Sequence, residues 1–226
     1  MKGITWGRVS RTDVQDTVII VASGTSLTGF NFEKLRGLGH IIAVNGSGNS
    51  VPFGDSWFTL DPWGIGPNGQ QLPTKFAGRL YAAVPEDFGT PTAQAANHRV
   101  SANPDITYLH RLRQHNIVGV SSETAYKIGL SEDSSCISTG NSGYGAFNLA
   151  YHLRPKKIIL LGIDGTIGYH YTKTSTNRPL TYLPKMFEST VEQIQKAGIE
   201  VINGSKDSVI TCYPRMSVED ALKEIV

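Results

Sequence analysis

The sequence predicts a single α/β domain, a three-layer Rossmann-like fold with a mostly parallel sheet. Two long apolar runs, Thr17–Ala22 and Lys156–Ile163, each end in a glycine-containing turn. Continuous apolar runs of this kind are typical of central parallel strands that are covered on both faces. Shorter apolar runs also end in small or polar residues, a rhythm typical of doubly wound sheets. We therefore expect Thr17–Ala22 and Lys156–Ile163 to be neighbouring central strands.

Length and composition fit this fold and exclude several classes. The 226 residues suit one domain over 1–226 with a sizeable core. A net charge of +2 gives no support to non-specific nucleic-acid binding. Cys136 and Cys212 stand far apart and in no metal-type spacing. No apolar run reaches the roughly 18–20 residues of a membrane span, and no secretory signal precedes the first strand, so we expect a cytoplasmic protein.

In the first half of the chain, short apolar runs that end in polar turns predict strands. These runs are Ile4–Val9, Thr17–Ala22, His40–Val44, Ser56–Leu60 and Arg79–Val84. Asn31–Leu35 is expected to form one or two helical turns, which Gly37 and Gly39 stop. Apart from Arg79–Val84, residues 63–116 are mostly irregular in pattern. We expect a lid-like or irregular insertion there, either a binding loop or a surface excursion.

In the second half, helix signals are clearer. A small-residue cluster, Ser138–Gly143, leads into apolar residues with helical spacing, and Pro155 ends that helix. The next helix has a proline in its first turn and a glycine just past its end, and the last begins with a capping box. The expected elements are strands at Ile117–Val120, Lys156–Ile163 and Ile199–Ile202 and helices at Tyr144–Leu153, Pro184–Ala197 and Ser217–Ile225.

Small and polar residues follow the predicted strands, at the edge where α/β sheets bind ligands. Gly24 has no Cβ, so a ligand can approach its backbone, and Thr25 and Ser26 add hydroxyls beside N–H groups that suit an anion. An ordinary capped turn is the alternative for Thr17–Ser26. No lysine stands in a phosphate loop, which argues against a P-loop kinase. The predicted nucleotide site comprises Ser23, Gly24, Thr25, Ser26, Asn45, Gly46, Asp61, Ser138, Thr139, Gly140, Asn141 and Ser142.

The candidate for catalysis is Tyr169-His170-Tyr171. Two phenols suit a departing phosphate, and an imidazole with a near-neutral pKa suits proton removal. A surface or edge-strand aromatic cluster is the alternative. Asp164, between Gly162 and Gly165, suits a ribose, a metal or an acceptor hydroxyl, and a simple turn-forming aspartate is its alternative.

Several short motifs occur in a fixed order along the chain. They are SGTSL (Ser23–Leu27), Asn45 at the end of the next strand, FTLDP (Phe58–Pro62), STGNSGYGAFNLAYHL (Ser138–Leu153) and KKIILLGIDG (Lys156–Gly165). This pattern resembles the bacterial sialyltransferases of glycosyltransferase family forty-two. It also resembles a related group that contains flagellin-glycosylation proteins and hydroxymethylpterin diphosphokinases. The compact size and Gly-rich, polar composition resemble those of a phage-encoded member.

The resemblance implies a metal-independent enzyme that uses a CMP-sugar. It implies that the turn Gly24–Ser26 faces the donor phosphate and that Asn45 and Asp61 hold the nucleotide. It implies further that Ser138–Gly140 holds the base or ribose. The chain has Asp61 before Pro62 where the family commonly has Asn-Pro, so the base contact or the nucleotide itself differs.

The resemblance also implies that Tyr169 and Tyr171 stabilise the leaving phosphate. The family's catalytic base is a histidine further downstream, but no histidine follows His170 in this chain. Either His170 has taken that role, or the protein does different chemistry, or it is inactive.

The sequence thus predicts a glycosyltransferase that moves a sugar from a nucleotide-sugar donor to an acceptor hydroxyl, with His170 as base and no cofactor or metal. One alternative is a Mg²⁺-dependent pyrophosphokinase of the pterin type, with Asp61 and Asp164 at the metal. Another is a non-catalytic nucleotide-binding or phage assembly protein. The acceptor, whether saccharide, protein or modified DNA base, and the oligomeric state cannot be predicted from the sequence.

Overall fold

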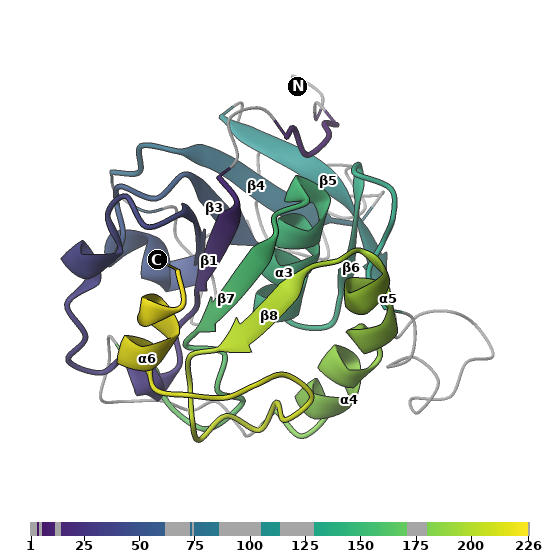
Figure 1. Cartoon of the computed structure of the whole chain (residues 1–226). Helices are drawn as coiled ribbons and strands as arrows, with labels where there is room; N and C mark the ends of the chain where they lie inside the picture. Colours follow the sequence, from purple (N-terminus) through teal and green to yellow (C-terminus); the bar gives the residue numbers. More distant parts are fainter. Residues whose placement is uncertain are drawn as a thin grey trace.

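A computed structural model describes residues 4, 6–11, 15–61, 73, 75–85, 105–113, 129–170 and 180–225. In this part of the chain eight strands form one sheet, and every neighbouring pair is parallel (Figure 1). The expected α/β fold is thereby confirmed. The strands are β1 (Thr17–Val21), β2 (His40–Val44), β3 (Ser56–Thr59), β4 (Arg79–Val84), β5 (Ile106–Arg113), β6 (Cys136–Thr139), β7 (Lys157–Leu161) and β8 (Glu200–Asn203).

The order in which the chain adds strands to the sheet reverses between β1 and β7. Its order is β6-β5-β4-β3-β2-β1-β7-β8, so the chain builds one half outward from β1 and then returns to add β7 and β8 on the other side. β1 and β7 pair from Thr17↔Lys157 to Val21↔Leu161, as the sequence predicts. Ligands of open α/β sheets bind at the carboxyl ends of the strands at such a switch point. The site is therefore sought beyond Val21 and Leu161.

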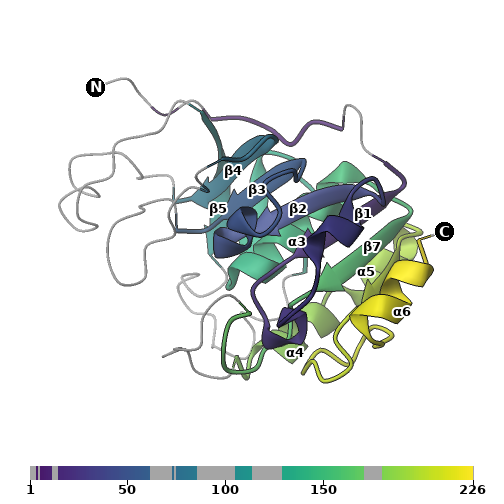
Figure 2. The same ribbon diagram turned by 90° about the vertical axis from the view of Figure 1, so that its left-hand side faces the viewer.

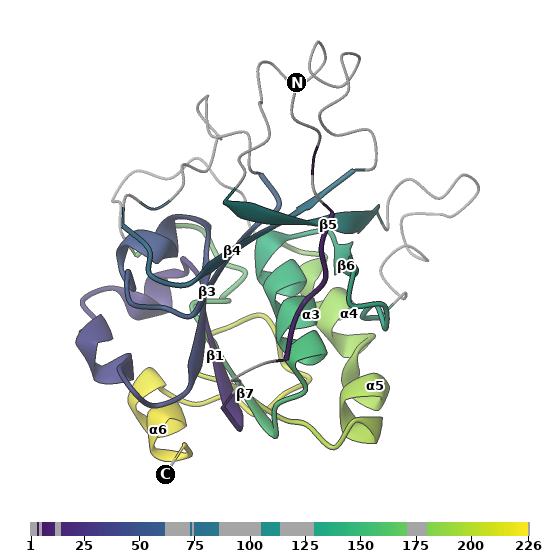
Figure 3. The same ribbon diagram turned by 90° about the horizontal axis from the view of Figure 1, so that it is seen from above.

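Helical layers cover the two faces of the sheet (Figure 2 and Figure 3). In β1, Val18 and Ile20 join the core on one face and Ile19 and Val21 the core on the other, all fully buried. Burial on both faces explains why this strand is continuously apolar. One layer consists of α3 (Ser142–Leu153), α4 (Leu183–Glu188) and α5 (Val191–Lys196). The other consists of the 3₁₀ turns η1 (Thr25–Leu27), η2 (Phe32–Leu35) and η3 (Asn45–Asn49) with α6 (Val218–Lys223).

The single helix expected over Pro184–Ala197 is in fact two helices, α4 and α5. The break falls at Ser189 and Thr190, whose hydroxyls donate to the carbonyls of Met186 (2.7 Å) and Phe187 (2.6 Å). Hydroxyl side chains that bond to nearby carbonyls compete with helical hydrogen bonding and favour helix ends. The helical spacing of apolar residues continues through the break, so the sequence pattern does not reveal that there are two helices.

Two strands were not predicted. β5 lies with β4 inside residues 63–116, so part of the expected insertion belongs to the sheet. β6 contains Ser138 and Thr139, which the sequence analysis placed in a small-residue cluster leading into a helix. Small polar residues obscure the strand pattern there. The strand expected at Ile4–Val9 is reduced to one bridge between Trp6 and Tyr108. The strand expected at Ile117–Val120 lies outside the described residues.

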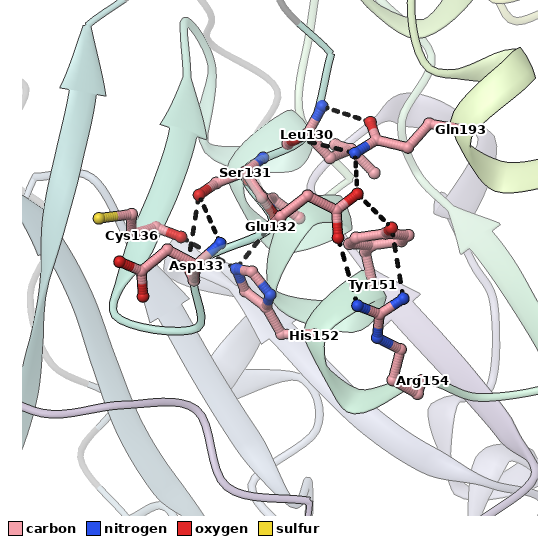
Figure 4. Close-up of polar contacts among 10 residues, drawn as sticks. Leu130, Ser131, Glu132, Asp133, Cys136, Tyr151, His152, Arg154 and Gln193 are labelled. Carbon is pink, nitrogen blue, oxygen red and sulfur yellow. Dashed lines mark hydrogen bonds and ion pairs between the residues drawn. The ribbon is translucent and has the colours of Figure 1, made fainter. Parts of the chain in front are cut away.

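A polar network holds the segment before β6 against α3 and α5. The fully buried Asn148 accepts hydrogen bonds at Oδ1 from the backbone N–H groups of Ser131 (2.9 Å) and Ser138 (2.8 Å). Nearer the surface, Glu132 accepts from Tyr151 Oη (2.7 Å) and Gln193 Nε2 (2.6 Å), as Figure 4 shows. These bonds attach β6 and the segment before it to the helical layer.

Asn148→Leu should therefore destabilise the protein strongly. The change leaves two buried N–H groups without their acceptor, and we expect the free energy of unfolding to fall by about 2–5 kcal/mol. Tyr151→Phe is the matched control on the same helix. It removes the hydrogen bond from Tyr151 Oη to the exposed Glu132 and the longer one that Oη accepts from Arg154 (3.3 Å). Because water can replace both partners near the surface, we expect a loss of only about 1 kcal/mol. Urea unfolding checks both values, and equal losses would contradict the structural part assigned to Asn148.

Candidate functional site

The turn after β1 holds an anion, and that anion is the side chain of Asp164. Ser26 donates from its backbone N to Asp164 Oδ2 (2.8 Å) and from Oγ to Oδ1 (2.7 Å). Gly24 N donates to Gly162 O (2.8 Å), so the two turns are joined at three points. Asp164 is only 4% exposed. The N–H and hydroxyl of Ser26, which the sequence assigned to a donor phosphate, are therefore already bound within the protein.

Gly24 is required by this junction. A Cβ at residue 24 would lie 2.4 Å from Asp164 Cγ and Oδ2 and 2.6 Å from Gly162 O. Its φ of −61° is available to any residue, so close approach and not backbone conformation demands glycine. The sequence correctly indicates that something approaches the backbone here. The group that approaches is the carboxylate of Asp164.

His170 lies where the turns after β1 and β2 meet. Its backbone N donates to Ser23 O (2.9 Å), and its Nε2 is 3.1 Å from Ser50 Oγ. The ring centroid of Phe32 lies 5.2 Å from that of the imidazole. The segment that leads to His170 packs on the β1 turn, because a Cβ at Gly168 would lie 2.6 Å from Thr25 Cγ2. The chain after β7 is thus held against the turn after β1, both at Asp164 and at His170.

Burial changes the pKa of the His170 imidazole. Desolvation lowers the pKa of His170, and the carbonyl of Ser23 and the charge of Asp164 oppose this shift without reversing it. The ring is therefore neutral at pH 7 and able to accept a proton. The Ser50–His170 contact joins residues 120 positions apart. The sequence analysis missed Ser50 and Phe32, and the only signal for Ser50 is its place at the end of a small polar run.

Asn45 and Asp61 come together on the β2–β3 side of the site. Thr59 Oγ1 donates to Asn45 Oδ1 (2.8 Å) and accepts from the backbone N of Asp61 (2.9 Å). Asn45 has a left-handed φ of 54°, a conformation that asparagine tolerates better than most residues. Gly46 follows in η3 and is half-buried. Burial raises the pKa of Asp61, and Arg111 partly offsets it.

The start of α3 reaches the switch point, but Ser138 does not. Ser138 is 1% exposed, and Thr139 lies beside it in β6. Beyond them, Asn141 caps α3 by accepting at Oδ1 from Gly143 N (2.8 Å). A Cβ at Gly143 would contact Ile163, the neighbour of Asp164, at 3.5 Å.

Gly140 and Ser142 lie at this same helix start. Tyr182 Oη donates to Gly140 O (3.4 Å), a contact that the sequence did not suggest. Ser142 is 9% exposed. Tyr169 is half-buried next to His170, and Tyr171 lies outside the described residues.

The two carboxylates of the pyrophosphokinase alternative are far apart. Asp61 follows β3 and Asp164 follows β7, three positions away in the sheet. At about 4.8 Å per strand the two strands are roughly 14 Å apart, and the Asp164 carboxylate is already bound to Ser26. Because Mg²⁺ binds its ligands directly at about 2.1 Å, a shared ion would require the two side chains to move. Within the described ranges, no three His, Cys, Asp or Glu side chains gather closely enough to hold a metal.

No protein-family model, no curated protein and no solved structure matches this chain. The resemblance to the sialyltransferases therefore stays a prediction. Among the helices of the described residues, none has the length and apolar character that crossing a membrane requires.

The junction between Gly24 and Asp164 can be tested by a double-mutant cycle. Gly24→Ala forces its Cβ against the carboxylate, so we expect a clear loss of stability by urea unfolding. In an Asp164→Ala background the carboxylate is gone and only the contact with Gly162 O remains. The same Gly24→Ala change should then cost less, since residues in contact are not additive. Additive losses would contradict the contact.

Acid should destabilise the protein through its buried histidines. Burial lowers the pKa of His40, His152 and His170 from the ordinary 6.5. Below about pH 6.5 the unfolded chain binds protons that the folded chain does not, so stability falls as the pH drops toward the lowered folded pKa. Their stabilising contribution is fully present above the unfolded pKa of about 6.5 and is lost as the pH falls from there through the lowered folded pKa.

Unfolding free energies between about pH 7.5 and pH 5.5 check this expectation. His152→Gln should reduce the pH dependence. Its imidazole Nε2 lies 2.9 Å from Cys136 O, a contact that the glutamine amide can replace without titrating. A pH dependence that is the same in this variant would exclude His152 as a contributor.

Proposed function

We propose that this chain is a nucleotide-sugar glycosyltransferase, with a CMP-sugar as favoured donor, in which His170 is the general base. The observation that carries the proposal is the position of His170. A neutral, half-buried imidazole stands at the β1/β7 switch point and contacts the turns after β1 and β2. General bases need a pKa near the working pH and a location beside the bound substrate. Doubly wound sheets bind their ligands at this point.

The donor is proposed to lie between the β2–β3 turns and the start of α3. Asn45 and Asp61 suit the nucleoside, because they are linked through Thr59 and lie at the carboxyl edge. Ser26 is already bound to Asp164, so we assign the phosphate to the amino end of α3. The amino end of this 12-residue helix presents a positive dipole end that favours an anion.

The leaving phosphate is assigned to phenols near His170. Tyr169 is the candidate among the described residues, and the family resemblance suggests Tyr171 for the same role. His170 is the final receiver of the proton that an acceptor hydroxyl loses as its oxygen bonds to the sugar. The acceptor is a saccharide, a protein or a modified DNA base. The wide separation of Asp61 and Asp164 favours this transferase over a Mg²⁺-dependent pyrophosphokinase.

His170→Ala should lower kcat by about 10²–10⁴-fold, the usual loss when a general base is removed. Donor affinity should change little, because the base serves the acceptor's proton and does not hold the nucleotide. Release of nucleotide from CMP-, UDP- and GDP-sugars, with and without Mg²⁺, measures turnover. Calorimetry with CMP, UDP, GDP and ATP measures binding.

His40→Gln is the control for loss of a half-buried histidine away from the site. His40 is the first residue of β2, so it lies at the amino ends of the strands, whereas the site lies at their carboxyl ends. The His40→Gln variant should therefore leave kcat unchanged. Full turnover by His170→Ala would show that His170 is not the base. Wild-type protein that binds a nucleotide but neither transfers nor hydrolyses any of these sugars would support the non-catalytic alternative instead.

A further inference from the structure

The two ring nitrogens of His170 have different surroundings. Nε2 lies 3.1 Å from Ser50 Oγ, and Nδ1 is buried. The backbone of His170 is bound to Ser23 O, and the ring of Phe32 lies near the imidazole. Among the described residues, Ser50 thus places a hydroxyl where it can pass a proton to Nε2.

Ser50 is held firmly enough to act on this contact. It follows η3, where its backbone N donates to Ser47 O (2.9 Å). Ser47 Oγ in turn donates to Ala22 O (2.8 Å), which fixes the turn to the end of β1. Ser50 itself is only half-buried, so its hydroxyl borders the site. A hydroxyl can donate one hydrogen bond while it accepts another.

We propose that Ser50 is a catalytic residue that relays the acceptor's proton to His170, an inference that rests on the proposed transferase function. The acceptor O–H proton moves to Ser50 Oγ as the Ser50 hydroxyl proton moves to His170 Nε2. The acceptor oxygen then bonds to the anomeric carbon of the sugar. The bond from that carbon to the phosphate oxygen breaks, and its electron pair leaves with the nucleotide. Ser50 is regenerated and His170 becomes an imidazolium.

The relay requires one tautomer of His170 before reaction. Ser50 must donate to an unprotonated Nε2, so the ring proton must be on Nδ1. A purely structural contact is also compatible with the reverse direction, in which Nε2–H donates to Ser50. A proton on Nε2 would therefore exclude the relay, and the tautomer can be measured without any substrate.

Long-range ¹H–¹⁵N spectra of the wild-type protein give the tautomer directly. We expect an unprotonated Nε2 whose chemical shift changes in Ser50→Ala and is restored in Ser50→Thr, which keeps the hydroxyl. Ser135→Ala is the control, since it removes a serine hydroxyl that bonds to Asp133, in the loop before β6 and away from His170. A protonated Nε2 in the wild type would overturn the relay, whether or not the protein proves to be a transferase.

Kinetic measurements are the second test of the relay. Ser50→Ala should lower kcat at least about tenfold, but less than loss of the base, and leave donor affinity unchanged, whereas Ser50→Thr retains most of kcat. Ser50→Ala combined with His170→Ala should be no slower than His170→Ala alone, because both belong to one proton path. Full turnover by Ser50→Ala would overturn the relay and leave the transferase proposal standing. A sugar covalently bound to Ser50, seen by intact mass, would also overturn it.

Discussion

The contact between Asp164 and Ser26 is the constraint on which this site depends. In a doubly wound sheet the chain leaves the two strands at the switch point toward opposite faces, and a crevice opens between them. Here a buried carboxylate bridges that crevice through both of its oxygens. Val209 N donates to Asp164 O (2.9 Å), so a later loop is held at the same point. The segment after Asp164 can then cross only over the β1 turn, and this path delivers His170 to Ser23 and Ser50.

An internal carboxylate and a bound phosphate make the same demands on a turn. Both need donors from backbone and hydroxyl groups, and both need a residue without Cβ where they approach. For this reason Gly24, Thr25 and Ser26 suggest a phosphate site in the sequence, while in the structure Ser26 binds Asp164. Which anion fills the turn depends on the pairing of β1 with β7, residues about 140 positions apart, and local sequence does not contain that information.

The same distinction, between local sequence patterns and contacts made by distant residues, separates the predictable from the unpredictable parts of the fold. β1 and β7 are buried on both faces, so their sequences are apolar throughout and identify them. β6 is short and polar at its end, and Ser138 is satisfied by Asn148, a partner on the following helix. The gap between α4 and α5 depends on two hydroxyl–carbonyl bonds that no apolar period reveals. In the site, Asp164 and His170 stood out by residue type, but Ser50 could be found only from the contact itself.

Burial of His170 has two opposing consequences for chemistry. It lowers the pKa, so the ring is neutral at pH 7, with one unprotonated nitrogen that is able to take a proton. It also removes Nδ1 from the surface and leaves Nε2 against Ser50, so the group best suited to accept a proton is poorly placed to meet a substrate. A hydroxyl between base and substrate resolves this conflict, because it takes the substrate's proton while it passes its own proton to the imidazole, and the ring stays buried. If the ring were exposed to water instead, direct contact would become available, but the desolvation that keeps its pKa low would be lost.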